Sequence, residues 1–180
     1  MLLYFPTPKA KARLINVVLA EPETVIYDVQ HDNAVQAHPN FTPAPLAATD
    51  KIKLNLITPL HLQKYGKVLA DDMTAKDLLM ALTRRYYLLQ EFHGQNYQAP
   101  DFSELAEHAL TVSCEKKLTW CHLQRYSTRQ QQKMRFDGVL GSISLTGELQ
   151  PFLSMLQAGQ WLHIGNKTSF GMGHYTIDKP

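Results

Sequence analysis

The chain has 180 residues and a mass of 20.5 kDa, which suits one domain of ordinary size or one domain with a fragment of a second. Hydrophobic residues make up 44% and charged residues 19%, so a core can form and wholesale disorder is disfavoured. The 18 Lys and Arg residues face 16 Asp and Glu residues, and the net charge of +2 does not by itself indicate a nucleic-acid partner.

Cys114 and Cys121 are too few for a disulfide framework, and their spacing matches neither a CxxC motif nor a zinc site, so we interpret both as buried thiols. No apolar run approaches the roughly 18 residues of a membrane span, and the first residues lack a signal-peptide core. These features predict a cytoplasmic protein without a membrane partner.

The first 50 residues differ from the rest of the chain. Residues 14–19 and 25–29 are rich in Val, Leu and Ile and are separated by Glu21-Pro22-Glu23, which predicts a pair of strands. Residues 31–50 contain Pro, Asn and Ala without an apolar period, which is typical of a linker. We therefore expect a compact domain over residues 51–180.

Within that domain, Ile52, Leu54 and Leu56 alternate with polar residues and predict a half-buried strand that ends at Thr58-Pro59. A helix follows, for which Thr74 is the expected N-cap and Gly94 the expected end. The apolar positions at helical spacing are Leu78, Ala81, Leu82, Leu89 and Phe92.

Shorter patterns predict the remaining elements. A helical turn is expected over 101–108, and a strand or hairpin over 110–122 with its turn at Lys116-Lys117. Val139, Ile143 and Leu145 share one face of the next strand. A second helix begins near Leu149, and a last strand spans 174–177.

This order of elements, βαββαβ, predicts an α+β protein with the ferredoxin-like (RRM-like) fold, in which two helices cover one face of an antiparallel sheet. The other face would be open to a ligand. Many domains of this topology that bind single-stranded RNA use that face.

The loop 165–173 carries three glycines, which can adopt positive φ angles and expose N–H groups to a phosphate. Lys167 would add positive charge, and Thr168 and Ser169 would add hydroxyl donors. The order of residues is not that of a Walker P-loop. A glycine-rich turn without a ligand is the alternative explanation of the same pattern.

Positive charge is concentrated in residues 110–136, which carry +5 while the rest of the chain carries −3. This distribution is typical of a phosphate-binding surface. Arg125 and Arg129 flank Tyr126, which could stack on an unpaired base. The alternative is a solvated hairpin whose basic residues protect an edge strand.

His122 and His174 could transfer a proton near neutral pH, although a structural role is the more common one for a single histidine on a strand. We expect His163 to be packed. The aromatic residues are most simply interpreted as core, and they are Tyr86, Tyr87, Trp120, Phe152 and Trp161.

Several segments together resemble a known family, the CRISPR repeat-processing endoribonucleases of the RAMP superfamily. The resemblance covers roughly residues 50–180 and corresponds to the C-terminal domain of those enzymes. The segments that carry it are Thr58-Pro59-Leu60, Leu82–Arg85, Trp120–Arg129, Phe136–Ser142, Gly147–Leu153 and Gly171-Met172-Gly173.

The resemblance implies recognition of the repeat in a CRISPR precursor RNA and its cleavage into guide RNAs for antiviral defence. Cleavage would use the RNA's own 2′-hydroxyl, need no metal or other cofactor, and leave a cyclic phosphate. RNA contact is implied for the residues of the glycine loop and of the basic stretch, which are Gly165, Lys167, Thr168, Ser169, Gly171, Gly173, Arg125 and Arg129.

Members of this family usually have two RAMP domains, and the catalytic histidine usually belongs to the first. We therefore interpret residues 1–30 as the last strands of an N-terminal RAMP domain and residues 51–180 as the C-terminal one. The alternative function is that of a non-catalytic RNA-binding RAMP subunit, with subunits of a CRISPR effector complex as partners. A small-molecule or metal-sensing domain is a third interpretation.

Overall fold

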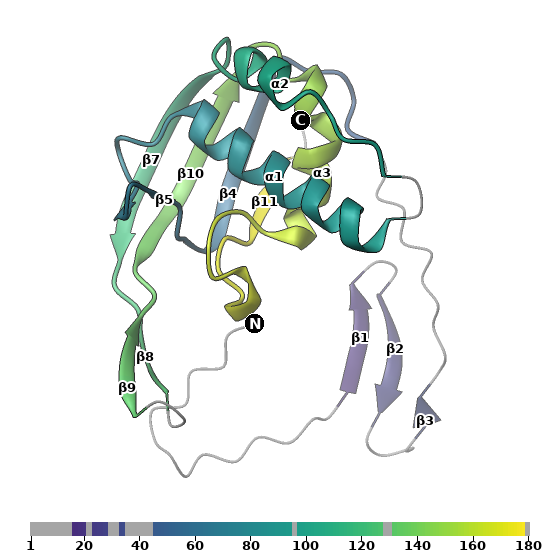
Figure 1. The fold of residues 1–180 in the computed structure, drawn as a ribbon. Helices are drawn as coiled ribbons and strands as arrows, with labels where there is room; N and C mark the ends of the chain where they lie inside the picture. The colour runs from purple at the N-terminus through teal and green to yellow at the C-terminus, as the bar shows by residue number, and fades with distance from the viewer. Residues whose placement is uncertain are drawn as a thin grey trace. The chain divides into compact units, whose positions relative to one another are not determined.

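In the computed structural model the chain divides into two compact units, Met1–Thr42 and Pro43–Pro180. The structure describes residues 16–20, 23–28, 33–34, 45–94, 97–127 and 131–178. The first unit holds an antiparallel sheet in the order β1-β2-β3 (Figure 1). Its strands are β1 (Asn16–Ala20), β2 (Glu23–Asp28) and β3 (Asn33–Ala34).

The pairing of β1 with β2 confirms the strand pair predicted before residue 30. The short strand β3 lies within the stretch that we predict to be a linker. Residues 35–44 of that stretch lie outside the described residues.

The second unit is built on a four-stranded sheet in the order β11-β4-β10-β7, with every neighbouring pair antiparallel. Its strands are β4 (Lys51–Leu60), β7 (Ser113–Cys121), β10 (Gly138–Thr146) and β11 (Tyr175–Ile177). Helices α1 (Ala75–His93) and α3 (Leu153–Leu162) lie over one face of this sheet (Figure 1). This strand order and helix placement confirm the ferredoxin-like fold.

Several smaller elements surround the sheet and its two helices. The short helix α2 (Phe102–His108) follows α1, as the sequence predicts. Two-stranded ribbons are formed by β5 (Gln63–Lys64) with β6 (Lys67–Val68), and by β8 (Gln124–Ser127) with β9 (Gln132–Arg135). Single 3₁₀ turns occur at η1 (Gln150–Phe152) and η2 (Thr168–Phe170).

The hydrophobic core lies between the sheet and the helices. Leu54 on β4 and Ile143 and Leu145 on β10 are fully buried, so the alternation in these strands correctly marks their inner face. The helices supply Leu78, Leu82, Leu156 and other residues to the same cluster. Each such side chain stabilises the fold by about 1.5–3 kcal/mol relative to an exposed one.

Helix α1 begins with the predicted cap. The Asp77 N–H donates to the Thr74 hydroxyl at 3.1 Å, and the Thr74 N–H donates to the Asp77 carboxylate at 3.1 Å. This capping box satisfies two N–H groups that the helix itself cannot pair. Lys64 also contacts Asp77, at 2.7 Å. Burial raises the pKa of Asp77, but the hydrogen bonds from Lys64 and Thr74 outweigh it and leave the pKa below its usual value.

Two predicted boundaries are wrong. Strand β7 runs without interruption through Lys116-Lys117, which we expected to form a turn. The Lys116 ammonium reaches the loop that precedes α1 and donates to the Asp71 carbonyl at 2.6 Å and to the Met73 carbonyl. Strand β4 continues past Thr58-Pro59 to Leu60, because its pairing with β10 shifts between Gly141 and Val139 and so accommodates a proline.

Candidate nucleic-acid interface

The glycine-rich loop connects α3 to β11 and turns sharply at several positions. Gly165, Gly171 and Gly173 have φ angles of +86°, +81° and +74°. Lys167 also adopts a left-handed conformation, with φ of +59°. Since this region is unfavourable for residues with a Cβ, the loop holds Lys167 in a defined, strained geometry.

At Gly173 the backbone of the loop passes very close to another part of itself. A Cβ at this position would lie 1.8 Å from the Ile164 carbonyl oxygen, so a side chain here would force the backbone to shift. The Ile164 N–H donates to the Gly173 carbonyl at 2.9 Å. Glycine is therefore required here by both the φ angle and the close approach.

The start and end of the loop are fastened to the end of β4. The Thr58 hydroxyl donates to the Gly171 carbonyl at 2.7 Å and accepts from the His174 N–H at 2.9 Å. The Gly173 N–H donates to the Pro59 carbonyl at 3.0 Å, and the Asn166 N–H donates to the His61 carbonyl at 2.8 Å. Much of the loop is thus fixed to the sheet.

These bonds change the expected role of the loop's N–H groups. Those of Ile164, Asn166, Phe170, Gly171 and Gly173 are already bonded within the protein, so they are not available to a phosphate. The side chains in the middle of the loop are further donors. Ser169 is exposed, and Lys167 and Thr168 are half-buried.

Lys167 joins the glycine loop to the base of the β8–β9 ribbon. Its ammonium donates to the Arg135 carbonyl at 2.6 Å and lies 5.1 Å from the centre of the Phe136 ring. The buried Phe136 packs edge-on against the half-exposed Phe170, with 5.0 Å between ring centres. The loop and the ribbon therefore form one continuous surface.

The ribbon itself is a narrow extension of β7 and β10 (Figure 1). Lys133 and Arg135 are exposed on β9 and, two residues apart in a strand, share a face. The exposed Tyr126 pairs with Lys133 in the register. Arg125 pairs with Met134, but its side chain lies outside the described part of the structure, as does the whole of Arg129.

The +5 segment is not a single patch. Lys116 is used within the fold, as described above, and the exposed Lys117 is paired with Ser142 on the open face of the sheet. The structure thus brings Lys167 to the base of the ribbon that carries Lys133 and Arg135, whereas Lys116 and Lys117 lie on β7.

His122 has a partner that the sequence did not reveal. Its Nδ1 lies 3.4 Å from the Asp137 carboxylate and accepts a hydrogen bond from the Trp120 indole N–H at 3.2 Å. Asp137 lies opposite His122 where the β7–β10 ladder passes into the ribbon. His122 and Asp137 meet because of the register between β7 and β10, and the composition of the segment between them does not determine that register.

His61 links Asp137 to the glycine loop. The imidazole is buried, and its Nδ1 contacts the Asp137 carbonyl. The backbone carbonyl of His61 accepts a hydrogen bond from the Asn166 N–H. Its Nε2 has no hydrogen-bond partner among the described residues. A chain of contacts therefore runs from His122 through Asp137 and His61 into the loop. Sequence reasoning assigned no role in the site to His61, Thr58 or Asp137, although Thr58 and Asp137 lie in segments that carry the family resemblance.

His174 also has a partner, His163, at the other end of the loop. The two rings are stacked, with 5.0 Å between their centres, and His163 Nδ1 lies 3.2 Å from the Met172 carbonyl oxygen. Burial, followed by the neighbouring His174, lowers the pKa of His163 below 6.5. Burial also lowers the pKa of His174. Both imidazoles are therefore held mainly neutral.

The aromatic and cysteine predictions are only partly confirmed. Phe152 is fully buried, and Tyr86 and Tyr87 pack against the core. Trp120 and Trp161 are 40% and 50% exposed, so their assignment to the core is wrong. Cys114 and Cys121 are free thiols that are half-buried rather than buried.

The open face of the sheet lacks the features of an RNA-stacking surface. The register places mostly short or charged side chains on it, namely Lys53, Asn55, Glu115, Lys117, Ser142, Ser144 and Thr176. The described strands β4, β7, β10 and β11 present no aromatic residue there, since Trp120 lies on the helix side and Tyr175 is buried. The Asp178 carboxylate accepts hydrogen bonds from Lys53 and Asn55 on this face.

In the described ranges, no cluster of three or more His, Cys, Asp or Glu side chains has the arrangement of a metal site. None of the helices there is long and apolar enough to cross a membrane.

Comparison with known structures supports the fold. A product complex of Cas6 matches with a TM-score of 0.51 and 18% identity, covering 73% of this chain and 54% of that one. Thermus thermophilus Cas6 matches with a TM-score of 0.54 and 18% identity, covering 72% and 53%. A Cas6 substrate mimic complex gives 0.50 and 18%, covering 72% and 54%. The chain thus spans about half the length of these relatives.

None of the curated protein sequences is a significant match to the chain. The sequence model of one family, however, matches residues 54–175, which extend from β4 to the first residue of β11 and include the ribbon and the glycine loop. That model describes the CRISPR-associated endoribonuclease Cas6. The chain therefore belongs to the Cas6 family of CRISPR-associated endoribonucleases.

Proposed function

We propose that this chain recognises the repeat of a CRISPR precursor RNA and takes part in its metal-independent cleavage into guide RNAs. The observation that carries the proposal is the family match over residues 54–175, because it spans the glycine loop and the ribbon that the loop contacts. The solved relatives, which include a product complex and a substrate mimic complex, add support through their shared fold.

The RNA backbone would lie along the glycine loop and the β8–β9 ribbon. Lys167, Lys133 and Arg135 supply positive charge there, and Thr168 and Ser169 supply hydroxyl donors. Salt-dependent contacts of this kind dominate the affinity of proteins for nucleic acids. The open sheet face is a poorer candidate because its strands lack aromatic side chains for stacking.

Cleavage would proceed by attack of a ribose 2′-hydroxyl oxygen on the adjacent phosphorus. The 2′-hydroxyl loses its proton, the bond from phosphorus to the 5′-oxygen breaks, and that oxygen takes up a proton. The products are a cyclic phosphate and a 5′-hydroxyl, and no metal is needed for the balance. Lys167 would supply positive charge that stabilises the phosphate during this step.

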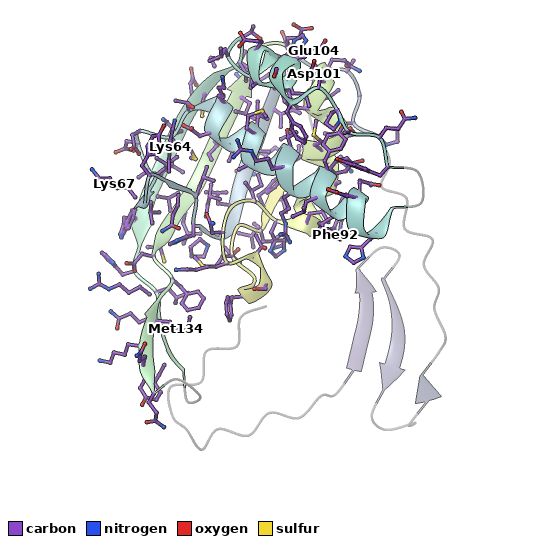
Figure 2. All side chains as sticks on the ribbon, viewed as in Figure 1. Lys64, Lys67, Phe92, Asp101, Glu104 and Met134 are labelled. Atoms are coloured by element: carbon purple, nitrogen blue, oxygen red, sulfur yellow. The ribbon has the colours of Figure 1, made fainter. Side chains whose placement is uncertain are left out.

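The test is an assay with RNA of the CRISPR repeat encoded in the same genome, labelled at its 5′ end and incubated with the chain in EDTA. We expect one cut per repeat and a product that ends in a cyclic phosphate. Lys167→Ala should reduce binding and cleavage. Lys67→Ala removes the same charge from the β5–β6 ribbon, which Figure 2 shows well apart from Met134 on β9, and should leave both unchanged.

The outcomes separate the two functions that the sequence left open. Binding without cleavage would favour the non-catalytic RNA-binding subunit. Failure to bind the repeat RNA would overturn both.

A further inference from the structure

Trp120 is exposed where a core residue was expected. Its neighbours on the same side of β7, Cys114 and Leu118, pack against the hydrophobic core, whereas 40% of the Trp120 surface is open to solvent. Exposure of a large aromatic ring forgoes much of the stabilisation that its burial would give. The exposed ring is therefore available to a ligand.

The indole ring is also fixed in orientation. Its N–H donates to His122 Nδ1 at 3.2 Å, and the two rings meet edge-on with 6.0 Å between their centres. His122, whose side chain is 77% exposed, is in turn held beside Asp137, which is connected through His61 to the glycine loop. An aromatic plane that is already fixed loses little conformational entropy when a ligand stacks on it.

The residues around Trp120 and His122 favour a single-stranded nucleic acid as the ligand. Trp120 and His122 lie where β7 ends and the ribbon begins, next to the segment whose Arg135 carbonyl binds Lys167. Exposed Lys133 and Arg135 lie on the ribbon beyond them. Proteins that bind single-stranded nucleic acids combine such a cationic track for phosphates with aromatic planes for bases.

Asp137 indicates which part of the RNA the aromatic pair contacts. A carboxylate beside the aromatic pair repels a phosphate but can accept a hydrogen bond from the N–H edge of a base. Asp137 is only 16% exposed, and its carbonyl contacts the buried His61, so its position is defined. The aromatic pair thus suits a base, and the lysines and arginine suit the phosphates on either side of it.

We propose that Trp120 and His122 form a stacking site for one unpaired base of single-stranded RNA. This inference rests on the proposed function, since it names the part of the RNA that this end of the surface receives. It adds a contact to a base, whereas Lys167 and the ribbon contact the backbone.

The test uses the fluorescence of Trp120. The chain has two tryptophans, so Trp161→Phe leaves Trp120 as the sole indole emitter. We expect repeat RNA to quench this emission on binding. A series of repeat RNAs, each with one base replaced by an abasic site, should contain one member that binds but no longer quenches.

Affinity provides a second measurement. Trp120→Ala should weaken binding by about 5- to 150-fold, the range for loss of one stacked base, and Trp120→Phe should retain most of the affinity. The abasic RNA that fails to quench should bind the wild type and Trp120→Ala equally well. Trp161→Phe should bind like the wild type. Circular dichroism and thermal melting establish that each variant is folded.

The results distinguish this inference from the proposed function. If the repeat RNA binds in a manner that depends on Lys167 while Trp120 emission and the affinity of Trp120→Ala stay unchanged, the stacking site is wrong and the proposed function stands. If the repeat RNA does not bind the wild type at all, both are wrong.

Discussion

The Thr58 hydroxyl donates to the Gly171 carbonyl at 2.7 Å and so ties the middle strand β4 to the glycine-rich loop. The same hydroxyl accepts from the His174 N–H at 2.9 Å. One side chain in the sheet thereby fixes the end of the loop that follows the turn from Thr168 to Phe170.

Thr58→Val should disturb the loop without changing the volume of the side chain. We expect a loss of about 1–3 kcal/mol in the free energy of unfolding, because the Gly171 carbonyl and the His174 N–H lose their partner. Repeat RNA should also bind more weakly. Thr58→Ser keeps the hydroxyl and should restore both, as measured by urea denaturation and fluorescence anisotropy. Equal affinities in the two variants would argue against a positioning role.

Lys167→Ala should weaken RNA binding most at low salt. For single strands, loss of one phosphate contact lowers the slope of log affinity against log salt by about 0.7. Arg129→Ala is expected to act in the same way, on the basis of the sequence alone. Anisotropy titrations between low and moderate salt measure the slope, with Lys67→Ala as the control. Unchanged affinity in both Lys167→Ala and Arg129→Ala would remove the proposed surface.

A pair of glycine substitutions separates backbone strain from steric overlap. Gly66 and Gly173 have similar φ angles, +79° and +74°, but only at Gly173 would a Cβ meet other atoms. Gly66→Ala should cost about 1–2 kcal/mol from the left-handed conformation alone. Gly173→Ala should lower the free energy of unfolding by about 1–3 kcal/mol more, because its Cβ overlaps other atoms. Thermal or urea unfolding tests the difference, and equal losses would contradict the close approach of Gly173 to Ile164.

Lys116 should matter for stability and not for RNA. Its ammonium donates to the carbonyls of Asp71 and Met73, and hydrogen bonds of charged groups contribute about 1.5–3 kcal/mol. Lys116→Met should therefore lower the free energy of unfolding by an amount of this order and leave RNA affinity nearly unchanged. Lys117→Met, on the exposed side of the same strand, should change stability by less than about 0.5 kcal/mol. A larger effect at Lys117 would reverse this assignment.

The stacked pair His163–His174 should make the fold less stable in mild acid. Burial lowers the pKa of both histidines in the folded state. The contribution of the pair to stability is therefore fully present above 6.5, the pKa of a histidine in the unfolded chain, and is lost as the pH falls through the lowered pKa values. Urea unfolding at pH 7.5, 6.5 and 5.5 should show this decline. His174→Gln should flatten it, and an unchanged decline in that variant would exclude the pair as its source.

Features set by local sequence were predictable. The cap of α1 depends on Thr74 and Asp77, three residues apart, and the alternation of Leu54 and Leu56 fixes the inner face of β4. The order of such elements was enough to predict the ferredoxin-like sheet. The glycines of the loop were also recognisable, although not the fact that many of its N–H groups are bonded internally.

Features set by distant residues were not predictable. Adjacent lysines between apolar residues are typical of a turn, but Lys116 is held in a strand by carbonyls more than 40 residues earlier in the chain. Trp120 lies on the same side of β7 as Cys114 and Leu118, which pack against the core, so the alternation of the strand does not reveal that Trp120 is exposed. His122 and Asp137 meet only through the register of β7 with β10, which the sequence between them does not specify.

The attachment of the glycine loop to β4 gives its two ends and its middle different dynamics. The Ile164 and Gly173 amides are bonded to carbonyls of Gly173 and Pro59, so their protons should exchange with solvent only when the end of the sheet opens. The turn at the exposed Ser169 should exchange rapidly. Bound RNA should slow exchange at this turn first, so hydrogen exchange can distinguish direct contact with the loop from a general tightening of the domain.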